Sequence, residues 1–325
     1  MRRGLILGKF HPLHIGHIAL IKLGLSQCDE LTVLVCASDK EKIPGEIRTE
    51  WIAKTFEESA KIKPLLYKYC EDKLPNTSVS SIAVSRIWAD EIKQILPGLN
   101  VIFSSEKYGD YLANFLSCEH VGYNLERKLP KLAASEIFKN PFLYWNDLAP
   151  AAKPYFVKKI CIYGTESTGK STLAQKLASY YNTVFVPETA REIMDTTDNC
   201  TEHHLQEIAR RHAKEIGKMT LIANRFLFVD TDINITRSYS RFLFKQVLEI
   251  EPWIEQANTF DLYLYLDNKV QHVQDGTRLD EIRRNELDLF HREELETKGL
   301  LFHKISGNWE ERFTNSLEII DSLFL

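Results

Sequence analysis

Residues 164–171 of this 325-residue chain are Gly164-Thr165-Glu166-Ser167-Thr168-Gly169-Lys170-Ser171, and this stretch decides the fold of the second half. The G-x4-G-K-S pattern follows an apolar run at 159–163 and precedes a helix-favouring run at 172–178. The two glycines allow backbone N–H groups to converge on phosphate oxygens, and the following helix directs its positive end at the same anion. The stretch therefore predicts a strand, a phosphate-binding loop and a helix, in that order.

The residue types of this loop indicate phosphoryl transfer from ATP. Lys170 is expected to reach the β- and γ-phosphates, and the Ser171 hydroxyl is expected to be a ligand of Mg²⁺. The sequence therefore predicts ATP and Mg²⁺ as cofactors. The residues predicted to hold the nucleotide are Gly164, Glu166, Ser167, Thr168, Gly169, Lys170, Ser171 and Thr172.

Carboxylates follow two further predicted strands. Phosphoryl transfer needs a metal-orienting carboxylate at the end of a neighbouring strand, and Asp230 comes directly after the apolar run 226–229. Asp230 is the preferred metal ligand and Asp232 is assigned to the substrate, although an Asp in a simple turn is the alternative. Glu188 follows the run 184–186 and is the candidate general base, with a partner of the helix dipole as the alternative.

Basic residues complete the predicted kinase site. Arg278, in the string Asp275-Gly276-Thr277-Arg278, is the candidate for neutralising charge on the transferring phosphate. A solvated basic helix paired with nearby acidic residues is the alternative. Arg191 is assigned to substrate binding. The string Asn268-Lys269-Val270-Gln271 lacks the aspartate of a guanine-reading N-K-x-D loop, which argues against a GTPase switch.

The alternation of apolar runs with helical patterns predicts an α/β fold for the whole chain. Pro150 and Pro154 interrupt that rhythm, so we expect two doubly wound parallel-sheet domains, at 1–150 and 151–325. Asn308, with Glu311 three residues later, predicts a capped final helix. Strands are expected at 5–7, 31–36, 101–104, 159–163, 184–186, 226–229, 262–266 and 302–305, and helices at 18–25, 50–59 and 172–178.

Composition excludes several classes of protein. A net charge of −4 gives no general attraction to nucleic acid or to an anionic membrane. The six cysteines are widely spaced without a C-x-x-C pair, which is typical of reduced thiols. No apolar stretch approaches the roughly 18 residues of a membrane helix, and the first apolar run is too short for a signal peptide. The sequence predicts a cytoplasmic protein without nucleic-acid or membrane partners.

A second motif, Gly8-Lys9-Phe10-His11-Pro12-Leu13-His14-Ile15-Gly16-His17, lies between the first predicted strand and helix. His14 and His17, at the positive end of that helix, could donate to phosphate oxygens and to the charge that grows during attack on an α-phosphate. A metal site is the alternative, but no further Cys or His nearby completes a ligand set.

This G-K-F-x-P-x-H-x-G-H string resembles the signature of nucleotidylyltransferases of the nicotinamide-nucleotide adenylyltransferase superfamily. The order of the motifs in the second half, which ends in Ile305-Ser306-Gly307-Asn308-Trp309-Glu310-Glu311-Arg312-Phe313, extends the resemblance to the bifunctional NadR family. Members combine nicotinamide mononucleotide adenylyltransferase and ribosylnicotinamide kinase. The resemblance implies a Rossmann-type nucleotidylyltransferase domain, then a P-loop kinase domain, with nicotinamide riboside and nicotinamide mononucleotide as substrates. It also implies nucleotide binding by Gly8, Lys9, Phe10, Gly16, Ser104 and Ser105.

The resemblance assigns Trp88 to the nicotinamide ring, with a place in the core as the alternative. It breaks at 132–138. Family members carry I-S-x-T-x-I-R there, whereas this chain has Ala133 for the serine and Phe138 for the arginine, and Glu136 adds a negative charge. Two lost hydrogen bonds to a charged group predict NAD synthesis weaker by about two to four decades. Lys131 or Lys139 are candidate substitutes.

Three functions follow from these observations. The first is a salvage enzyme that makes nicotinamide mononucleotide and then NAD. The second is a kinase regulated by a nucleotide-binding first domain, and the third is a P-loop kinase for another nucleoside. Regulatory members of the family carry a DNA-binding helix-turn-helix before the first strand, so we expect no repressor role here. A homo-oligomer is compatible with the sequence.

Overall fold

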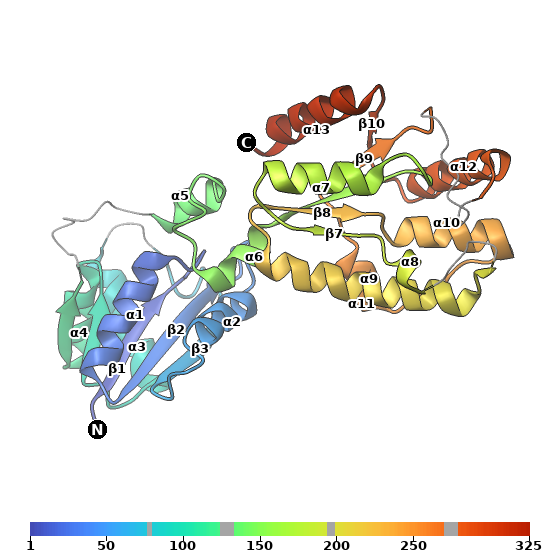
Figure 1. The fold of residues 1–325 in the computed structure, drawn as a ribbon. Coiled ribbons are helices and arrows are strands. Elements are labelled where there is room, and N and C mark those ends of the chain that lie inside the picture. The colour runs from blue at the N-terminus through green and yellow to red at the C-terminus, as the bar shows by residue number, and fades with distance from the viewer. Residues whose placement is uncertain (77–79, 124–132, 194–198, 270–278) are drawn as a thin grey trace. The chain divides into compact units, whose positions relative to one another are not determined.

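The computed structural model describes the chain except for residues 77–79, 124–132, 194–198 and 270–278. The described residues form two compact units, Met1–Tyr155 and Phe156–Leu325. Each unit contains a five-stranded parallel sheet with helices on both faces, which confirms the two α/β folds expected from the sequence (Figure 1). The boundary expected after residue 150 falls within a short helical stretch, η1 (Pro150–Ala152) and α6 (Lys153–Phe156).

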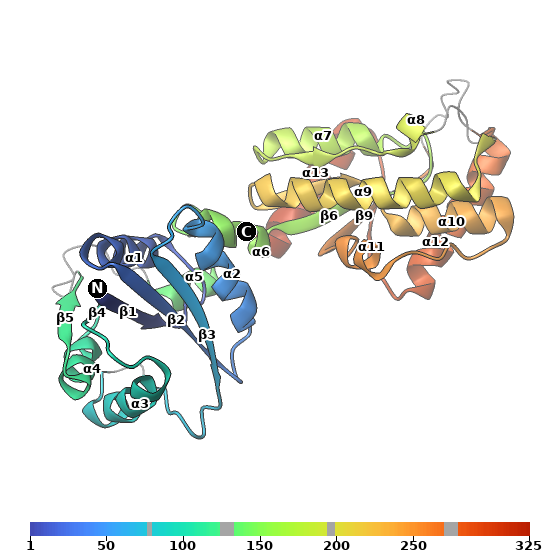
Figure 2. The same cartoon turned by 90° about the horizontal axis from the view of Figure 1, so that it is seen from below.

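The first unit has the strand order β3-β2-β1-β4-β5. Helices α1 and α2 cover one face of this sheet, and α3 and α4 cover the other (Figure 2). Strand order reverses beside β1, so the loops after β1 and β4 leave the same edge of the sheet as neighbours. The elements are β1 (Arg3–Gly8), α1 (Ile15–Gln27), β2 (Glu30–Ser38), α2 (Gly45–Thr55), β3 (Ile62–Tyr69), α3 (Ile82–Ile95), β4 (Val101–Ser104), α4 (Tyr108–Leu116), β5 (Glu119–Gly122) and α5 (Ala134–Lys139).

The second unit has the strand order β10-β9-β6-β8-β7. Helices α7 and α13 pack on one face, and α9 and α11 lie on the other (Figure 1). The elements are β6 (Lys158–Tyr163), α7 (Lys170–Tyr180), β7 (Phe185–Val186), α8 (Ala190–Ile193), α9 (Glu202–Ile222), β8 (Phe226–Asp230), α10 (Ile233–Phe244), α11 (Pro252–Ala257), β9 (Leu262–Leu266), α12 (Glu281–Thr297), β10 (His303–Ile305) and α13 (Trp309–Phe324).

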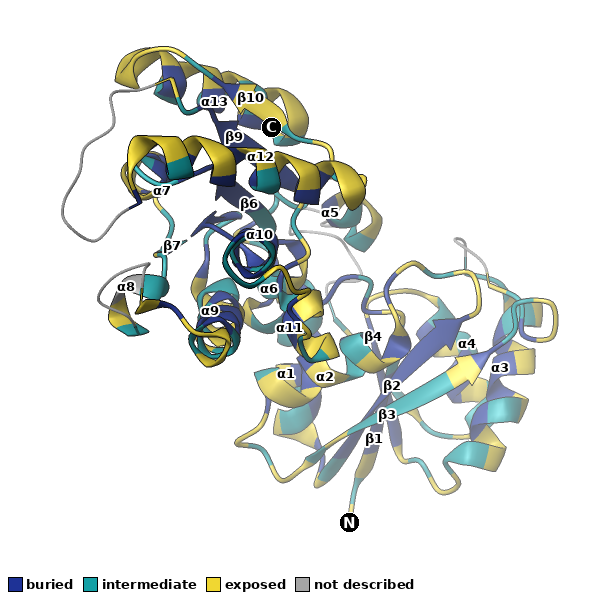
Figure 3. Cartoon of the chain, turned by 90° about the vertical axis from the view of Figure 1, so that its right-hand side faces the viewer, coloured by how far each residue is buried: buried dark blue, intermediate teal, exposed yellow. Residues whose placement is uncertain are grey.

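Burial explains why the sequence predicted the central strands. Central strands such as β2 and β9 are buried along almost their whole length, and they read as continuous apolar runs (Figure 3). The edge strands β3 and β5 were not predicted. β3 carries two lysines and Pro64, and it tolerates the proline because it pairs with β2 alone. β5 is a short polar edge strand.

One predicted helix was placed wrongly. The helix expected at 50–59 is α2, which begins at Gly45, directly after Pro44, and ends at Thr55. Pro44 restricts the backbone just before the helix, and Glu46 in the first turn favours an early start through the helix dipole. The final helix was correct, since Asn308 and Glu311 form the expected capping box at the start of α13.

Matched substitutions in one interior strand of each sheet test whether the units unfold separately. Ile102 of β4 and Ile160 of β6 are both fully buried, so Ile102→Ala and Ile160→Ala should each cost about 2–5 kcal/mol. Hydrogen exchange measured peptide by peptide should show faster exchange only in the unit that carries the substitution. Equal acceleration in both units would show that they unfold as one body.

Candidate active sites

The phosphate loop connects β6 to α7 at the carboxyl end of the second sheet. Gly164 has φ 138°, and a Cβ there would lie 2.6 Å from the carbonyl oxygen of Leu266. Gly169 has φ 86°, and Ser167 between them is also left-handed, with φ 59°. Both glycines are therefore required by their positive φ angles. Gly164 is also required by its close approach to β9.

The interior of the loop is organised by its own side chains. Thr168 Oγ1 donates to the carbonyl oxygen of Thr165 at 2.8 Å, and Lys170 Nζ donates to the same oxygen at 3.0 Å. Both threonines are fully buried and Lys170 is nearly so. The Lys170 ammonium is thus held against the loop from which it is predicted to reach phosphates.

Two oxygens predicted to bind metal meet at the ends of neighbouring strands. The hydroxyl of Ser171, in the first turn of α7, donates to Oδ2 of Asp230 at the end of β8. A hydroxyl and a carboxylate are hard oxygen ligands, and Mg²⁺ usually takes only one or two protein ligands beside phosphates and water. The pair therefore fits Mg²⁺. Among the described residues, no group of three or more His, Cys, Asp or Glu could by itself hold a metal ion.

Asp232, assigned to the substrate, is engaged inside the protein. It caps α10, where Oδ1 accepts from the backbone N–H groups of Asn234 at 2.9 Å and Ile235 at 3.1 Å. Oδ2 accepts from the Tyr263 hydroxyl at 3.0 Å. Burial raises the pKa of this carboxyl to about 6. The hydrogen bonds favour its charged form and oppose that rise. The observed partners of Asp232 are those of a buried helix cap.

Glu166 shares its surroundings with Glu188. Glu166 Oε1 accepts from the Tyr239 hydroxyl at 2.6 Å, and its Oε2 accepts from the N–H of Leu279 at 3.1 Å. Burial first, and then the charges of Glu166 and Glu188, raise the pKa of Tyr239 well above its usual range. Glu188 is half-buried beyond β7. Arg278 and the side chain of Arg191 lie outside the part of the chain that the structure describes.

Two buried arginines hold the loop in place, a role that the sequence did not predict for either residue. Arg312 Nη1 donates to the carbonyl oxygen of Thr168 at 2.9 Å, and its Nη2 pairs with Asp267 at 2.8 Å. Arg284 Nε donates to the carbonyl oxygen of Glu166 at 3.0 Å. Burial lowers the pKa of Arg312, and the carboxylate of Asp267 opposes that change. The available signal was Asp267, which follows a buried strand as Asp230 does.

His291 of α12 lies within the electrostatic reach of Lys170. Its Nδ1 makes a hydrogen bond with Ser238 Oγ, and its buried Nε2 has no hydrogen-bond partner among the described residues. Burial, and then the charge of Lys170, lower the pKa of His291 to about 3. The ring is therefore neutral at pH 7.

In the first unit, the loop after β1 places His14 and His17 together. His14 caps α1, and its Nδ1 accepts from the N–H of Gly16 at 3.1 Å. Because Nδ1 accepts, the proton of the neutral ring is on Nε2, which can donate to an anion. The two histidine rings lie 3.8 Å apart between centroids. Burial lowers the pKa of His14 to about 4. Burial, and then the neighbouring His14, lower the pKa of His17 well below its usual range.

The other predicted residues of this loop have different surroundings. Phe10 is buried against His17, with ring centroids 4.9 Å apart. The ammonium of Lys9 pairs with Glu41 at 3.0 Å, and its carbonyl oxygen accepts from buried Arg48 at 2.6 Å. The predicted positions Gly8 and Gly16 lie at the two ends of the loop, where β1 ends and α1 begins.

Phe138, which replaces the arginine of the family pattern, faces this loop. Its ring lies 4.5 Å from the ring of His11, and the Lys42 ammonium lies 5.9 Å from its centroid. Ala133 precedes α5 without a side-chain cap, and Glu136 and Lys139 are exposed. Lys131 lies outside the described residues. Lys42 therefore brings a cation to the surroundings of Phe138, which sequence reasoning missed because Lys42 is distant in sequence.

A cavity of about 170 Å³ opens beside the same loop. Its walls include Gly8, Tyr69, Trp88, Glu106 and Tyr108. Trp88 packs edge-on against Tyr69 and donates from Nε1 to the carbonyl oxygen of Pro75 at 3.2 Å. Trp88 is therefore both a core residue and part of a cavity wall.

The predicted residues Ser104 and Ser105 follow each other where β4 ends. Ser104 is fully buried, and its backbone carbonyl accepts from the N–H of Tyr123 at 2.8 Å. Ser105 is exposed in the loop that leaves the sheet beside the loop of the histidines. The structure thus brings both predicted nucleotide loops of the first unit to one edge of its sheet.

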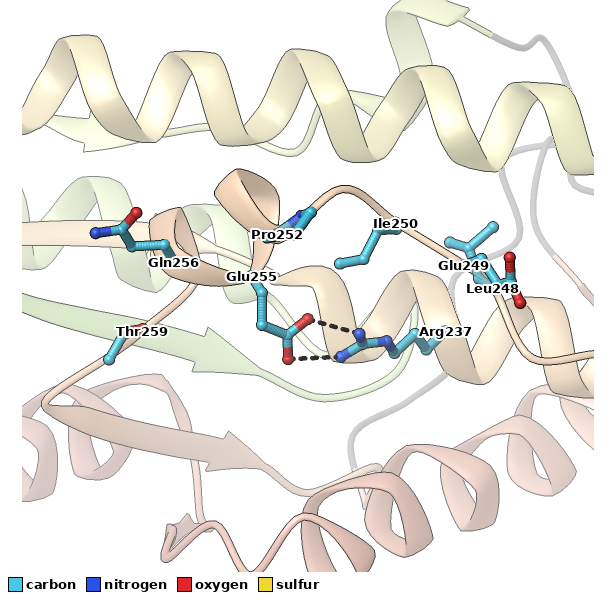
Figure 4. A pocket seen from close by; sticks show the side chains of 8 residues that line it. All are labelled: Arg237, Leu248, Glu249, Ile250, Pro252, Glu255, Gln256 and Thr259. Atoms are coloured by element: carbon cyan, nitrogen blue, oxygen red, sulfur yellow. Dashed lines mark hydrogen bonds and ion pairs between the residues drawn. The ribbon is translucent and has the colours of Figure 1, made fainter.

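An open concavity of about 620 Å³ lies over α10 and α11 of the second unit (Figure 4). Its lining contains none of the predicted site residues. Arg237 crosses it to pair with Glu255 at 2.6 Å. Arg237 and Glu255 in its lining thus pair with each other, and we assign no function to this concavity.

Comparisons with known proteins find relatives for the whole chain and for its parts. A family model described as an AAA domain matches residues 159–312. The chain is 28% identical over 344 residues to the trifunctional NAD biosynthesis/regulator protein NadR of Escherichia coli (strain K12), which covers 98% of this chain and 82% of that protein. The chain is NadR-like along nearly its whole length. The solved "NadR protein in complex with NR" shares its fold, with a TM-score of 0.77 and 19% identity over 99% of this chain and 96% of that chain.

The first half of this NadR-like chain has relatives of its own. It is 25% identical over 166 residues to the nicotinamide-nucleotide adenylyltransferase of Thermococcus onnurineus (strain NA1), which covers 49% of this chain and 83% of that protein. The relatives are thus an adenylyltransferase for one half and NadR for the whole. Among the described residues, no helix is long and apolar enough to cross a membrane.

The neutral, buried ring of His291 predicts a pH dependence of stability. The pKa of His291 is lower in the folded protein than in the unfolded chain. The contribution of its neutral ring to the free energy of unfolding is therefore fully present above about pH 6.5 and is lost as pH falls toward 3. His291→Gln removes this titration. The free energy of unfolding of the wild type, relative to that of the variant, should fall by about 2 kcal/mol between pH 6.5 and 5 in urea titrations. A constant difference would contradict the lowered pKa.

Proposed function

We propose that the protein is a NAD salvage enzyme with two consecutive activities. The second unit phosphorylates nicotinamide riboside with ATP to give nicotinamide mononucleotide. The first unit transfers the adenylyl group of a second ATP to that mononucleotide, which gives NAD and pyrophosphate. The observation that carries this proposal is the meeting of Ser171 and Asp230 beside Lys170, in a chain aligned with NadR along 98% of its length.

In the kinase unit, the protein holds the phosphates and removes the acceptor proton. Lys170 binds the β- and γ-phosphates, and Glu188 accepts the proton from the attacking hydroxyl of the riboside. Arg278 neutralises charge on the transferring group, and Arg191 binds the substrate. Asp232, which the sequence assigned to the substrate, supports this site only from within the protein as the cap of α10. Mg²⁺, which Ser171 and Asp230 would hold, supplies further neutralisation of phosphate charge when it is bound.

In the first unit, the histidine pair stabilises the α-phosphate during attack by the mononucleotide phosphate. The neutral rings of His14 and His17 can donate N–H groups without the repulsion that two imidazolium ions would suffer. The cavity beside Gly8 would take the nicotinamide ring, since Trp88 and Tyr69 give it an aromatic wall. The loop with Phe10 and Gly16, and the loop after β4 with Ser105, would face the rest of the nucleotide.

A kinase with a regulatory first unit is the second candidate, and Phe138 favours it. The ring occupies the place of an arginine beside the histidine loop, and an aromatic ring cannot donate to a triphosphate. The two candidates share the kinase and differ only in whether the first unit synthesises NAD.

The kinase activity is tested with nicotinamide riboside, ATP and Mg²⁺. Lys170→Ala should lower the formation of nicotinamide mononucleotide at least about 100-fold, because a buried cation at the phosphates is lost. Lys176→Ala is the matched control, since this lysine lies on the same helix, is exposed, and pairs with Glu310. If the wild type does not phosphorylate nicotinamide riboside but phosphorylates another nucleoside in a panel, the kinase has a different acceptor.

NAD synthesis is tested with nicotinamide mononucleotide and ATP. The wild type should be slow, and His17→Ala should lower its rate at least about 100-fold. Phe138→Arg should raise kcat/KM at least about tenfold, because it restores a charged donor beside the loop. Leu143→Arg is the control. Leu143 is 75% exposed, and its replacement adds the same charge five residues later in the chain. A rate unchanged by Phe138→Arg would refute the electrostatic cause of slowness, and no synthesis at all would favour the regulatory candidate.

A further inference from the structure

Three side chains form a relay beneath the loop after β4. Ser104 Oγ lies 2.9 Å from His120 Nε2, and His120 Nδ1 lies 2.6 Å from Asp110 Oδ1. They come from β4, β5 and the first turn of α4. Such a chain resembles the order of a hydrolytic triad, but Ser104 is fully buried, so it cannot present a nucleophile to a substrate.

The hydrogen bonds of the relay have a defined direction. The Ser104 hydroxyl has one proton, which it donates to the carbonyl oxygen of Glu106 at 2.8 Å. A carboxylate can only accept, so His120 Nδ1 donates to Asp110, and His120 Nε2 lies within hydrogen-bond distance of Ser104 Oγ. The relay therefore ends on the backbone of Glu106.

The relay is also packed tightly against the helix that follows the loop. A Cβ at Gly109 would lie 2.2 Å from both His120 Nε2 and Ser104 Oγ. Its N–H donates to the carbonyl oxygen of Glu106 at 3.1 Å, so this one oxygen receives two hydrogen bonds. The backbone of residues 104–109 is thereby held by the Ser104 side chain and by the first turn of α4.

The fixed loop forms one wall of the cavity in the first unit. Glu106 and Tyr108 both line that cavity, together with Trp88 and Gly8. The Tyr108 hydroxyl donates to the carbonyl oxygen of Leu7 at 3.1 Å, which connects this wall to the end of β1. The relay therefore acts on the shape of the cavity through the backbone, and none of its side chains lines it.

We propose that Asp110, His120 and Ser104 are positioning residues that hold the wall of a binding pocket for nicotinamide mononucleotide. This inference rests on the proposed adenylyltransferase activity, whose ring pocket is the cavity at Trp88. Loss of the relay lets the wall move, so the free enzyme must order it again when substrate binds. The effect falls on the affinity for the mononucleotide, because the histidine pair that stabilises the transition state lies on the other loop.

The test is steady-state NAD synthesis by the full chain, with calorimetry of nicotinamide mononucleotide binding in parallel. His120→Phe and Ser104→Ala should each raise the KM and the dissociation constant for the mononucleotide roughly tenfold, with kcat within about twofold. His120→Gln, whose amide can still donate to Ser104, should recover part of the affinity. Combining His120→Phe with Ser104→Ala should add little to either single change.

Two controls separate positioning from general damage. Glu119 precedes His120 on β5, and Glu119→Gln removes its exposed ion pair with Arg2. This variant should leave the KM for the mononucleotide unchanged. Phosphorylation of nicotinamide riboside by the second unit should be unaffected in every variant. If His120→Phe prevents folding of the first unit, Ser104→Ala and His120→Gln still decide the outcome.

The outcomes distinguish the inference from the activity on which it rests. NAD synthesis with an unaltered KM in the relay variants overturns the relay alone. No synthesis, with mononucleotide binding that weakens in the variants, overturns the adenylyltransferase and supports the relay. A fall in kcat without a change in KM would overturn the positioning role, and neither synthesis nor binding by the wild type would overturn both proposals.

Discussion

The buried guanidinium of Arg312 is the constraint on which the second site depends. It joins the phosphate loop at Thr168, the end of β9 at Asp267 and the turn before α13 at Gly307. Because a peptide unit is planar and trans, the Thr168 carbonyl that faces Arg312 turns the N–H of Gly169 the opposite way. A buried arginine deprived of its partner leaves an uncompensated charge, which costs about 3–5 kcal/mol. The conformation of the loop therefore depends on residues about a hundred or more positions later.

The first unit reaches a comparable result with different means. Its loops after β1 and β4 meet where the strand order reverses, which is the usual place for a ligand in an open parallel sheet. The segment after α5 closes over the first loop, because Ile15 donates to the carbonyl oxygen of Asp147 at 2.9 Å and Ala149 donates to that of Leu13 at 3.1 Å. The position of Phe138 beside His11 follows from this return of the chain. A substitution that moves that segment would therefore also move the histidine loop.

The sequence predicted those features that arise from local patterns. The apolar runs of buried strands, the glycines of the phosphate loop and the cap at Asn308 each depend on a few adjacent residues, and each was correct. Edge strands such as β3 escaped because polar residues and Pro64 hide a half-exposed strand. Arg312 and His120 escaped for another reason. Their roles depend on partners distant in sequence, and a single sequence does not show which residues the fold will bring together.

The packing of Trp309 on Gly169 has a consequence for how this chain can change. A Cβ at Gly169 would lie 1.9 Å from Cη2 of Trp309, although the tryptophan is 53% exposed and could move outward. The glycine is therefore constrained twice, by its φ of 86° and by a ring supplied by the last helix. Replacing Trp309 by a small residue would release only the second constraint. Over evolutionary time, the aromatic position can vary while the glycine stays fixed, so the two positions should drift at unequal rates.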